Sequence, residues 1–406
     1  MSTALDTSVS PPPAAVSTIA LLDHFARLDD PRQSAKVVFP LPEIMLLVLA
    51  ATIAGCDDHV EVCEWGRERL DFLRRYLRFR DDIPSHDTLT DVVNALDPEL
   101  FKSCFMDWVA CLRASDPTVP QACEFEVIAV DGKTSRRTHD KAKGRKPLHL
   151  VSAWASRQRL VLGQQATEEK SNEITAIPLL LERLFLKGAI VTIDAMGCQT
   201  AIAEKIIEKG GDYCLALKGN RPALQDEVER LFVDPKAAGV ATETIETVDK
   251  DHGRLEIRSH TVCHDIDWLF SDRRHPGELK FPGLAMIGMV ESQTERNGQV
   301  EPARRYYLCS KKLSAKTFAE VVRAHWGVEN RLHWTLDVIF DEDQCRLRTG
   351  HGPENMAVVR HACPGPRSGV ALNMLQAPKS KTSLKIRRKK AGWNTTYLGD
   401  IIRGAG

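Results

Sequence analysis

The sequence lacks the cysteine spacings that tie small secreted folds together. It has eleven cysteines, but no CxxC pair, and the number is odd, so no regular disulfide framework is indicated. Cys56 and Cys63, like Cys104 and Cys111, are seven residues apart on predicted helices, which is the spacing of one buried stripe. The cysteines therefore predict reduced, buried side chains in a protein of the cytoplasm.

Long hydrophobic runs are also missing. The most apolar stretch, Ile44 to Ala54, is too short to span a bilayer and predicts a core helix. The first residues carry no basic region followed by an apolar one, so we expect no signal peptide and no membrane partner. A chain of 406 residues can bury a large core, and we expect two or more domains.

Net charge is absent as well, since 55 Lys and Arg balance 55 Asp and Glu. Basic residues are nevertheless concentrated in two segments. Residues 376–406 carry eight Lys or Arg against one Asp, and residues 131–147 carry seven against two. A solvated tail is the simpler interpretation of the first segment. Phosphate binding becomes the stronger alternative for the second, because it begins at an acidic residue of the candidate site described below.

The first third of the chain is helical in pattern. Residues 1–18 are rich in Ser, Thr, Ala and Pro and are predicted to be disordered. From Ile19 to about Ser115 apolar residues recur at helical spacing, which predicts a helical N-terminal domain over residues 19–118. Turn residues before two of these helices, at 84–87 and 97–98, would suit a DNA-binding helix-turn-helix, although most short helical pairs are only packing units.

After Pro120 the pattern changes to alternating strands and helices. This order predicts an α/β domain over residues 119–375 with a mixed sheet flanked by helices, interrupted by a β-rich insertion at about 222–314 and followed by a basic tail, 376–406. A long amphipathic helix is predicted from about Ala315 towards Phe340. The remaining elements are expected as strands at 125–130, 148–155, 159–166, 189–193 and 212–217 and helices at 173–186 and 199–209.

Asp131 and Asp194 each end a short β-branched run, EVIAVDGK and GAIVTIDAM. Two neighbouring strands can direct two such carboxylates at one point, where they would bind a hard divalent cation. The alternative for either residue alone is a cap on the following helix.

Two other clusters have simpler interpretations. His325, Glu329 and His333 recur every four residues, which makes a zinc site conceivable, but the spacing is not HExxH and neighbouring tryptophans favour a packed helix face. The turn at 171–173 is interpreted as a helix cap.

Four segments together carry a family resemblance. They are AVDGKTSRR at 129–137, EEKSNEITAIPLLL at 168–181, TIDAMGCQTAIAEKIIEKGGDYCLALKGNRP at 192–222 and HWGVENRLHWTLDVIFDED at 325–343. With them the chain resembles the H-repeat-associated transposases of bacterial insertion sequences, from about residue 20 to the end. The resemblance implies an RNase H-like fold with an Asp-Asp-Glu site in which Asp131 is the first acid, Asp194 the second and Glu329 the third.

The chemistry of the acids agrees with this resemblance. Phosphodiester cleavage needs acidic ligands for two Mg²⁺ or Mn²⁺ ions, one activating the attacking oxygen and one stabilising the leaving oxygen. Asp131 would contact both ions, and Asp194 and Glu329 one each. The implied function is a nucleoid-associated DNA transposase that binds terminal repeats, cleaves at the ends and joins 3′-hydroxyls to target DNA. A nuclease without strand transfer and an inactive DNA-binding remnant are the alternatives.

The implied partners are double-stranded DNA and further copies of the chain. Candidate DNA contacts are the basic or amide residues that follow each acid and those of the tail: Lys133, Arg136, Arg137, Lys218, Asn220, Arg221, Lys385, Arg387, Arg388, Lys389 and Lys390.

Two features depart from the wider group. The Arg and Lys that accompany the third acid in some relatives are His325 and Leu336 here. Residues 363–370 include Pro364, Pro366 and Gly369 where the family pattern is one helix, and they predict a loop that interrupts it.

Overall fold

The computed structural model describes residues 20–115, 125–167, 172–219, 221–235, 239–251, 254–267, 281–296, 299–361 and 382–402. The 1–18 leader, Asn220 and the 363–370 interruption lie outside these residues. The N-terminal part is helical, as predicted, and consists of α1 (Ala20–Phe25), α2 (Leu41–Ala54), α3 (His59–Glu68), α4 (Leu70–Leu73), α5 (His86–Ala95) and α6 (Pro98–Ser115).

Helix α2 is the centre of this helical part. Pro42 lies in its first turn, and Gly55 ends it in the left-handed conformation with φ 115°, which favours glycine. Nearly every side chain from Leu41 to Ile53 is buried, so the apolar stretch is a core helix, as expected. No described helix combines the length and the apolar character needed to cross a membrane.

Five strands form the mixed sheet that the sequence predicts. They are β1 (Val127–Ser135), β2 (Leu148–Ala155), β3 (Leu160–Thr167), β4 (Ile190–Ile193) and β5 (Asp212–Leu217), in the order β3-β2-β1-β4-β5. Strands β1, β2 and β3 are antiparallel neighbours, whereas β4 and β5 run parallel to β1. This is the RNase H-like arrangement that the family resemblance implies.

The predicted β-rich insertion continues this sheet. Its strands are β6 (Thr242–Asp251), β7 (Arg254–Cys263), β8 (Met286–Arg296) and β9 (Gln299–Cys309), preceded by α9 (Pro222–Val233). Because β9 pairs antiparallel with β5, the insertion extends the first five strands into one nine-stranded sheet. Strands β5 to β9 of this sheet thus lie within the 134 residues that separate Asp194 from Glu329.

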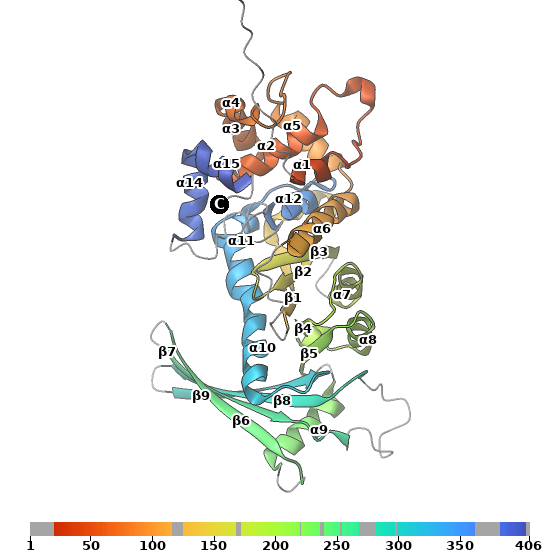
Figure 1. Ribbon diagram of the computed structural model, residues 1–406, viewed down its shortest axis with the longest axis vertical. Helices are drawn as coiled ribbons and strands as arrows, with labels where there is room; N and C mark the ends of the chain where they lie inside the picture. Colours follow the sequence, from red (N-terminus) through yellow and green to blue (C-terminus); the bar gives the residue numbers. More distant parts are fainter. Residues whose placement is uncertain are drawn as a thin grey trace, which may run out of the picture.

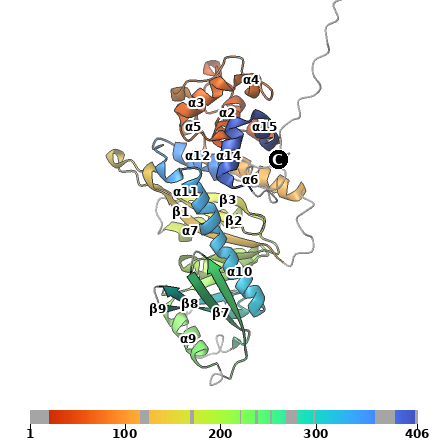
Figure 2. The same cartoon turned by 90° about the vertical axis from the view of Figure 1, so that its left-hand side faces the viewer.

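Helices cover both faces of the sheet. Helix α10 (Ala315–Gly327) crosses one face over β1, β4, β6 and β7, and α7 (Glu173–Glu182) and α8 (Thr200–Glu208) lie on the other (Figures 1 and 2). A small core that includes Met286 and Phe318 lies beneath α10. A larger core joins the sheet to the N-terminal helices, so α6 and α12 (Gly352–His361) pack between the two parts.

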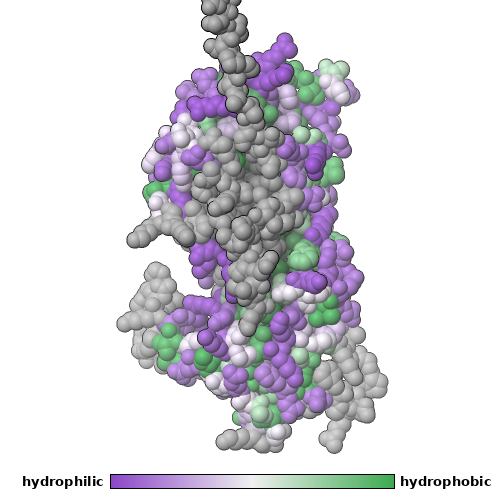
Figure 3. Space-filling view, in the orientation of Figure 1, coloured by the Kyte–Doolittle hydropathy of each residue, from purple (hydrophilic) through white to green (hydrophobic). Residues whose placement is uncertain are grey.

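The molecule is elongated, with the N-terminal helices at one end and β6–β9 at the other (Figure 1). On the face shown in Figure 3, hydrophobic residues are scattered among hydrophilic ones. This pattern is that of an ordinary solvated surface.

The C-terminal segment differs from the expected tail. Residues 384–402 form α14 (Leu384–Trp393) and α15 (Thr395–Ile402), which pack against α2. Arg388 is buried: its guanidinium binds the Asp57 carboxylate at 2.6 Å, donates to backbone carbonyl oxygens and lies 4.6 Å from the centre of the Phe340 ring. The mixture of basic and apolar residues in α14 does not by itself predict that the guanidinium of Arg388 points into the protein.

Candidate active site

Asp131 and Asp194 are brought together by strand register. In the parallel pair β1 and β4, Val130 lies opposite Ile193, so the next residue of each strand is an aspartate at the same edge of the sheet. Strand β1 continues past Asp131 to Ser135 because it still pairs with β2 there, which the sequence did not indicate. The convergence of the two carboxylates follows directly from this register.

Each aspartate also binds a nearby backbone amide. Oδ1 of Asp131 accepts from the Gly132 N–H at 2.9 Å, and Oδ1 of Asp194 accepts from the Met196 N–H at 3.0 Å. Asp194 thereby caps a short 3₁₀ helix, Ala195–Gly197. Asp194 therefore does act as a helix cap, and the hydrogen bond to Met196 orients its carboxylate at the sheet edge.

Glu329 lies on the long helix that the sequence predicts, but in a part with different geometry. Helix α10 runs into a π-helical segment, Val328–His333, and then into α11 (Trp334–Val338). Such segments widen one turn of a helix and recur at functional sites. The Glu329 side chain is exposed, and its charge acts on Asp131.

The acids repel one another. Burial, and then the charges of Asp194, Glu173 and Glu329, raise the pKa of Asp131 to about 7. The ring of His333 lies close by, with its Nδ1 3.7 Å from Oδ2 of Asp131. Burial, and then Lys133, lower the pKa of His333 to about 3, so this ring is neutral at pH 7 and does not balance the carboxylates.

His325 lies next to strand β4. Its Nδ1 lies 3.0 Å from the Thr192 hydroxyl on β4, and burial lowers its pKa. The long helix thus places one neutral histidine by Asp131 and another by the strand that carries Asp194.

The donor set fits a divalent cation in charge and in kind. Hard cations prefer carboxylate oxygens, and within the described residues the ion pair of Asp131 is with the ring of His333, which is neutral at pH 7. Within the described parts of the chain, no three His, Cys, Asp or Glu side chains stand at metal-ligand spacing, and this includes the trio His325, Glu329 and His333. The acids are thus neighbours whose carboxylates would have to draw closer around an ion.

The raised pKa predicts an unusual pH dependence of stability in cation-free protein. Between pH about 4 and about 7 the unfolded chain has lost the Asp131 proton and the folded chain keeps it, so stability falls as pH rises through this range. Asp131→Asn removes the penalty. We expect the variant to melt at a higher temperature than wild type at pH 8, and the gain to vanish near pH 4.

Calorimetry in the presence of a chelator measures this difference, and Asp91→Asn on the exposed face of α5 is the control. A variant that melts at the wild-type temperature at pH 8 would show that Asp131 is not under electrostatic strain.

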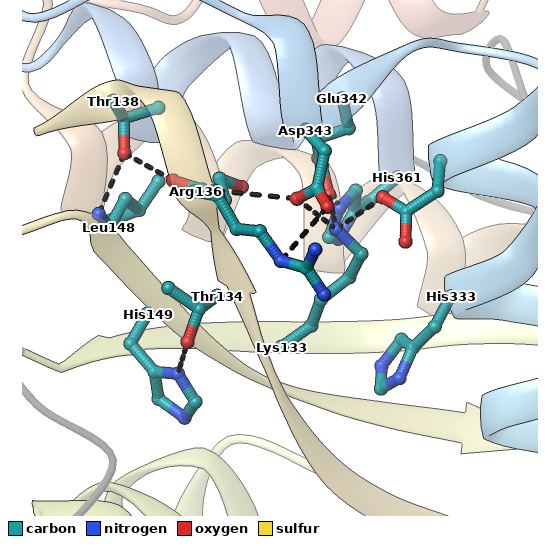
Figure 4. A network of polar contacts seen from close by, with 12 residues as sticks. Lys133, Thr134, Arg136, Thr138, Leu148, His149, His333, Glu342, Asp343 and His361 are labelled. Atoms are coloured by element: carbon teal, nitrogen blue, oxygen red, sulfur yellow. Dashed lines mark hydrogen bonds and ion pairs between the residues drawn. The ribbon is translucent and has the colours of Figure 1, made fainter.

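The sequence predicts that Lys133 contacts a DNA phosphate, but in the structure this lysine binds carboxylates of the protein. Its Nζ lies 2.7 Å from Asp337 Oδ1, 3.1 Å from Glu342 Oε2 and 3.5 Å from Asp343 Oδ1, and the side chain is 8% exposed. Figure 4 shows the lysine directed at Glu342 and Asp343. The charge of Lys133 is balanced inside the protein, which ties β1 to the segment that follows the third acid.

Glu342 is the most buried acid of this group. It is 1% exposed, and its Oε1 lies 2.9 Å from Nε2 of His361 on α12 (Figure 4). Burial alone would raise the pKa of Glu342, but His361, Lys133 and Arg360 together hold it well below its usual range. We call Lys133, Asp337, Glu342, Asp343 and His361 the Lys133 cluster.

The other predicted DNA contacts fall into two groups. Arg136, Arg137, Lys218, Lys385, Lys389 and Lys390 are exposed, although Arg136 also reaches Asp343 at 3.2 Å. Arg221 is half-buried and donates to Gln199 at 3.0 Å, whereas Arg387 and Arg388 are buried in α14. Only the first group presents its charge to solvent.

Sequence reasoning missed several residues around the acids. Glu173, interpreted as part of a helix-capping turn, is 3% exposed and acts electrostatically on Asp131. His149, Glu342 and His361 are also buried and paired. The signal that could have found Glu173 is its place at the start of the first helix after β3, on the side of the sheet where β1 ends.

Comparison with known proteins finds relatives over nearly the whole chain. The family described as "Transposase DDE domain" matches residues 121–363, and the one described as "DDE_Tnp_1-associated" matches residues 22–109. The "H repeat-associated putative transposase YhhI" of Escherichia coli (strain K12) is 38% identical over 391 residues, covering 95% of this chain and 98% of that protein. The "Putative transposase YncI" of Escherichia coli O157:H7 is 38% identical over 392 residues, covering 95% of each.

These matches confirm the resemblance to H-repeat-associated proteins. The domain match spans both aspartates, the third acid and the Lys133 cluster, and the match to YhhI extends over nearly the whole of both chains. The chain therefore belongs to the family of transposases that carry the transposase DDE domain.

Proposed function

We propose that this transposase binds the terminal repeats of its element, cleaves phosphodiesters at the element ends with two Mg²⁺ or Mn²⁺ ions, and joins the exposed 3′-hydroxyls to target DNA. The observation that carries the proposal is the register of β1 and β4, which sets Asp131 beside Asp194 at the sheet edge where the charge of Glu329 also acts. Acids so arranged suit two-metal phosphoryl chemistry.

Asp131, Asp194 and Glu329 would hold the cations. When bound, the ions would activate the attacking oxygen and stabilise the leaving oxygen. His333 lies near Asp131 and His325 contacts β4, and burial lowers the pKa of both rings, so neither adds positive charge to the site at pH 7. The Lys133 cluster holds the segment after Glu329 against β1, which fixes the third acid relative to the first two.

The proposed partners are double-stranded element ends and target DNA, bound by more than one copy of the chain. Arg136, Arg137 and Lys218 lie in the segments that follow the two aspartates and are exposed, so they are the basic side chains most available to a bound strand. The exposed lysines of α14 form a second basic surface at the helical end of the molecule.

The deciding experiment uses labelled terminal-repeat DNA, a target plasmid and Mg²⁺. Cleavage at the repeat end followed by joined products supports the proposal. Cleavage without joining would instead show a metal-dependent nuclease, and specific binding without cleavage an inactive remnant.

Charge on α14 gives a separate prediction. If Lys385, Lys389 and Lys390 contact phosphates, replacing all three with Gln should weaken binding to every DNA sequence. The slope of log K against log salt should flatten by about 0.9 for each lost contact. Titrations at several salt concentrations measure this, with Lys187, Lys312 and Lys316, also exposed, replaced as the control. Equal slopes for the two triple variants would exclude α14 from the DNA interface.

A further inference from the structure

A fourth acidic side chain acts electrostatically on Asp131, the first acid of the proposed site. Glu173 is the first residue of α7, and it is almost entirely buried at 3% exposure. Its charge acts on Asp131 together with those of Asp194 and Glu329. A buried carboxylate next to other carboxylates is costly unless something positive compensates it, so this placement calls for an explanation.

The backbone next to Asp131 is shaped to admit this carboxylate. A Cβ added to Gly132 would lie 2.2 Å from Oε1 of Glu173 and 2.6 Å from Nε2 of His149, closer than such atoms can approach. Glycine is therefore the residue that allows Glu173 to reach the strand directly after the first acid. The carboxylate thus lies on the α7 face of the sheet, against the strand position that directly follows Asp131.

Two consecutive hydrogen bonds through His149, which link strands β1 and β2 to α7, set the orientation of Glu173. Nε2 of His149 lies 2.7 Å from Oε1 of Glu173, and Nδ1 of the same ring lies 2.7 Å from the Thr134 hydroxyl. His149 on β2 is the registered partner of Thr134 on β1. Figure 4 shows the contact between His149 and Thr134. Since both ring nitrogens are engaged, the imidazole is fixed and holds one oxygen of the carboxylate.

The other oxygen is the one that can serve the site. Among the described residues, the Glu173 side chain forms its hydrogen bond and ion pair with His149, which contacts Oε1. Oε2 belongs to the same buried carboxylate, which His149 holds by Oε1 and whose charge acts on Asp131. A divalent cation at the acids would compensate this charge together with those of Asp131 and Asp194.

We propose that Glu173 is a fourth acidic residue of the cation site, oriented by His149 and needed for tight binding of a divalent cation next to Asp131. The proposal rests on the proposed function of the acids as cation ligands. It assigns to the EEKSNEI segment a part in the chemistry, where sequence alone suggested a helix cap.

Mn²⁺ binding to the full-length protein tests this without requiring catalysis. Calorimetric titration or electron paramagnetic resonance gives the dissociation constant. Glu173→Gln keeps the size of the side chain and a hydrogen bond to His149, so we expect a folded protein whose Mn²⁺ dissociation constant rises about 10- to 100-fold. Glu182→Gln, exposed at the other end of α7, is the matched control and should bind as wild type does.

Wild-type affinity in folded Glu173→Gln, with Asp131→Asn impaired, would overturn the proposal for Glu173 alone. Wild-type affinity in both variants would instead overturn the cation site itself, and with it the proposed function. If Glu173→Gln does not fold, His149→Gln tests the same arrangement, because it leaves every acid in place but removes the ring that orients Glu173. A dissociation constant raised about threefold or more would support the proposal, and an unchanged one would overturn it.

Discussion

Glu329→Gln is expected to abolish DNA cleavage while leaving folding and terminal-repeat binding intact. The amide keeps the volume of the side chain but removes one of the charges at the proposed cation site. Loss of a single group that stabilises transition-state charge lowers rates by about 10²- to 10³-fold, and we expect at least this effect for Glu329, as for Asp131→Asn and Asp194→Asn. Glu329 is exposed, so its replacement should not disturb the core.

Cleavage of labelled element ends and gel-shift binding are the paired measurements. Glu320→Gln, also exposed and on the same long helix, is the control and should cleave normally. Asp337→Asn should retain measurable cleavage, because Asp337 contacts Lys133 at 2.7 Å instead of joining the three acids. Cleavage by Glu329→Gln together with its loss in Asp337→Asn would refute the assignment of the third acid.

The second large effect concerns stability. Lys133→Met removes the cation from the Lys133 cluster and leaves Glu342 buried with His361 and Arg360 only. Breaking a buried ion pair by removing one partner costs about 3–5 kcal/mol, and we expect the free energy of unfolding to fall by this amount. Denaturant titration measures it.

Arg136→Met is the matched control, because Arg136 also pairs with Asp343 but its side chain is 80% exposed. An exposed pair contributes about 0–1 kcal/mol, so the control should lose little. Combining Lys133→Met with Glu342→Gln should cost less than the sum of the two single changes, since the stranded charge is then gone. Equal losses for Lys133→Met and Arg136→Met would show that the cluster is not a stabilising unit.

The low pKa of Glu342 fixes the pH at which this stabilisation exists. A depressed pKa in the folded state stabilises the protein above the unfolded value, about 4.3 for Glu, and the contribution is lost as pH falls below it. The difference between wild type and Lys133→Met should therefore be largest at neutral pH and should shrink in acid.

Strand positions and the two aspartates could be predicted because they depend on local pattern. Short β-branched runs end at Asp131 and Asp194, and the structure places their strands side by side in register. The ends of the elements were less certain: β1 continues to Ser135, because its pairing with β2 persists after its pairing with β4 has ended.

The surroundings of the acids could not be predicted, because they depend on long-range contacts. Nothing in the residues near Lys133 indicates that Glu342, more than 200 positions later, will meet it. The π-helical turn at Glu329 has the same sequence pattern as an ordinary helix, so the sequence does not reveal it. The sequence of α14 likewise does not indicate that Arg388 points into the protein. Composition gave the charge of these segments but not the direction in which each side chain points.

The continuous nine-stranded sheet has a consequence for the order in which the chain acquires its chemistry during synthesis. Strands β1 and β4 can pair once about 200 residues have emerged, but α10, which leads to Glu329, packs across β1 and β4 at one end and β6 and β7 at the other. The surface on which α10 packs is complete only when β6–β9 have joined β5. The segment that follows α10 also needs His361, which pairs with Glu342. We therefore expect a ribosome-bound chain to carry two aligned aspartates for much of its synthesis and to complete the proposed site only near the end.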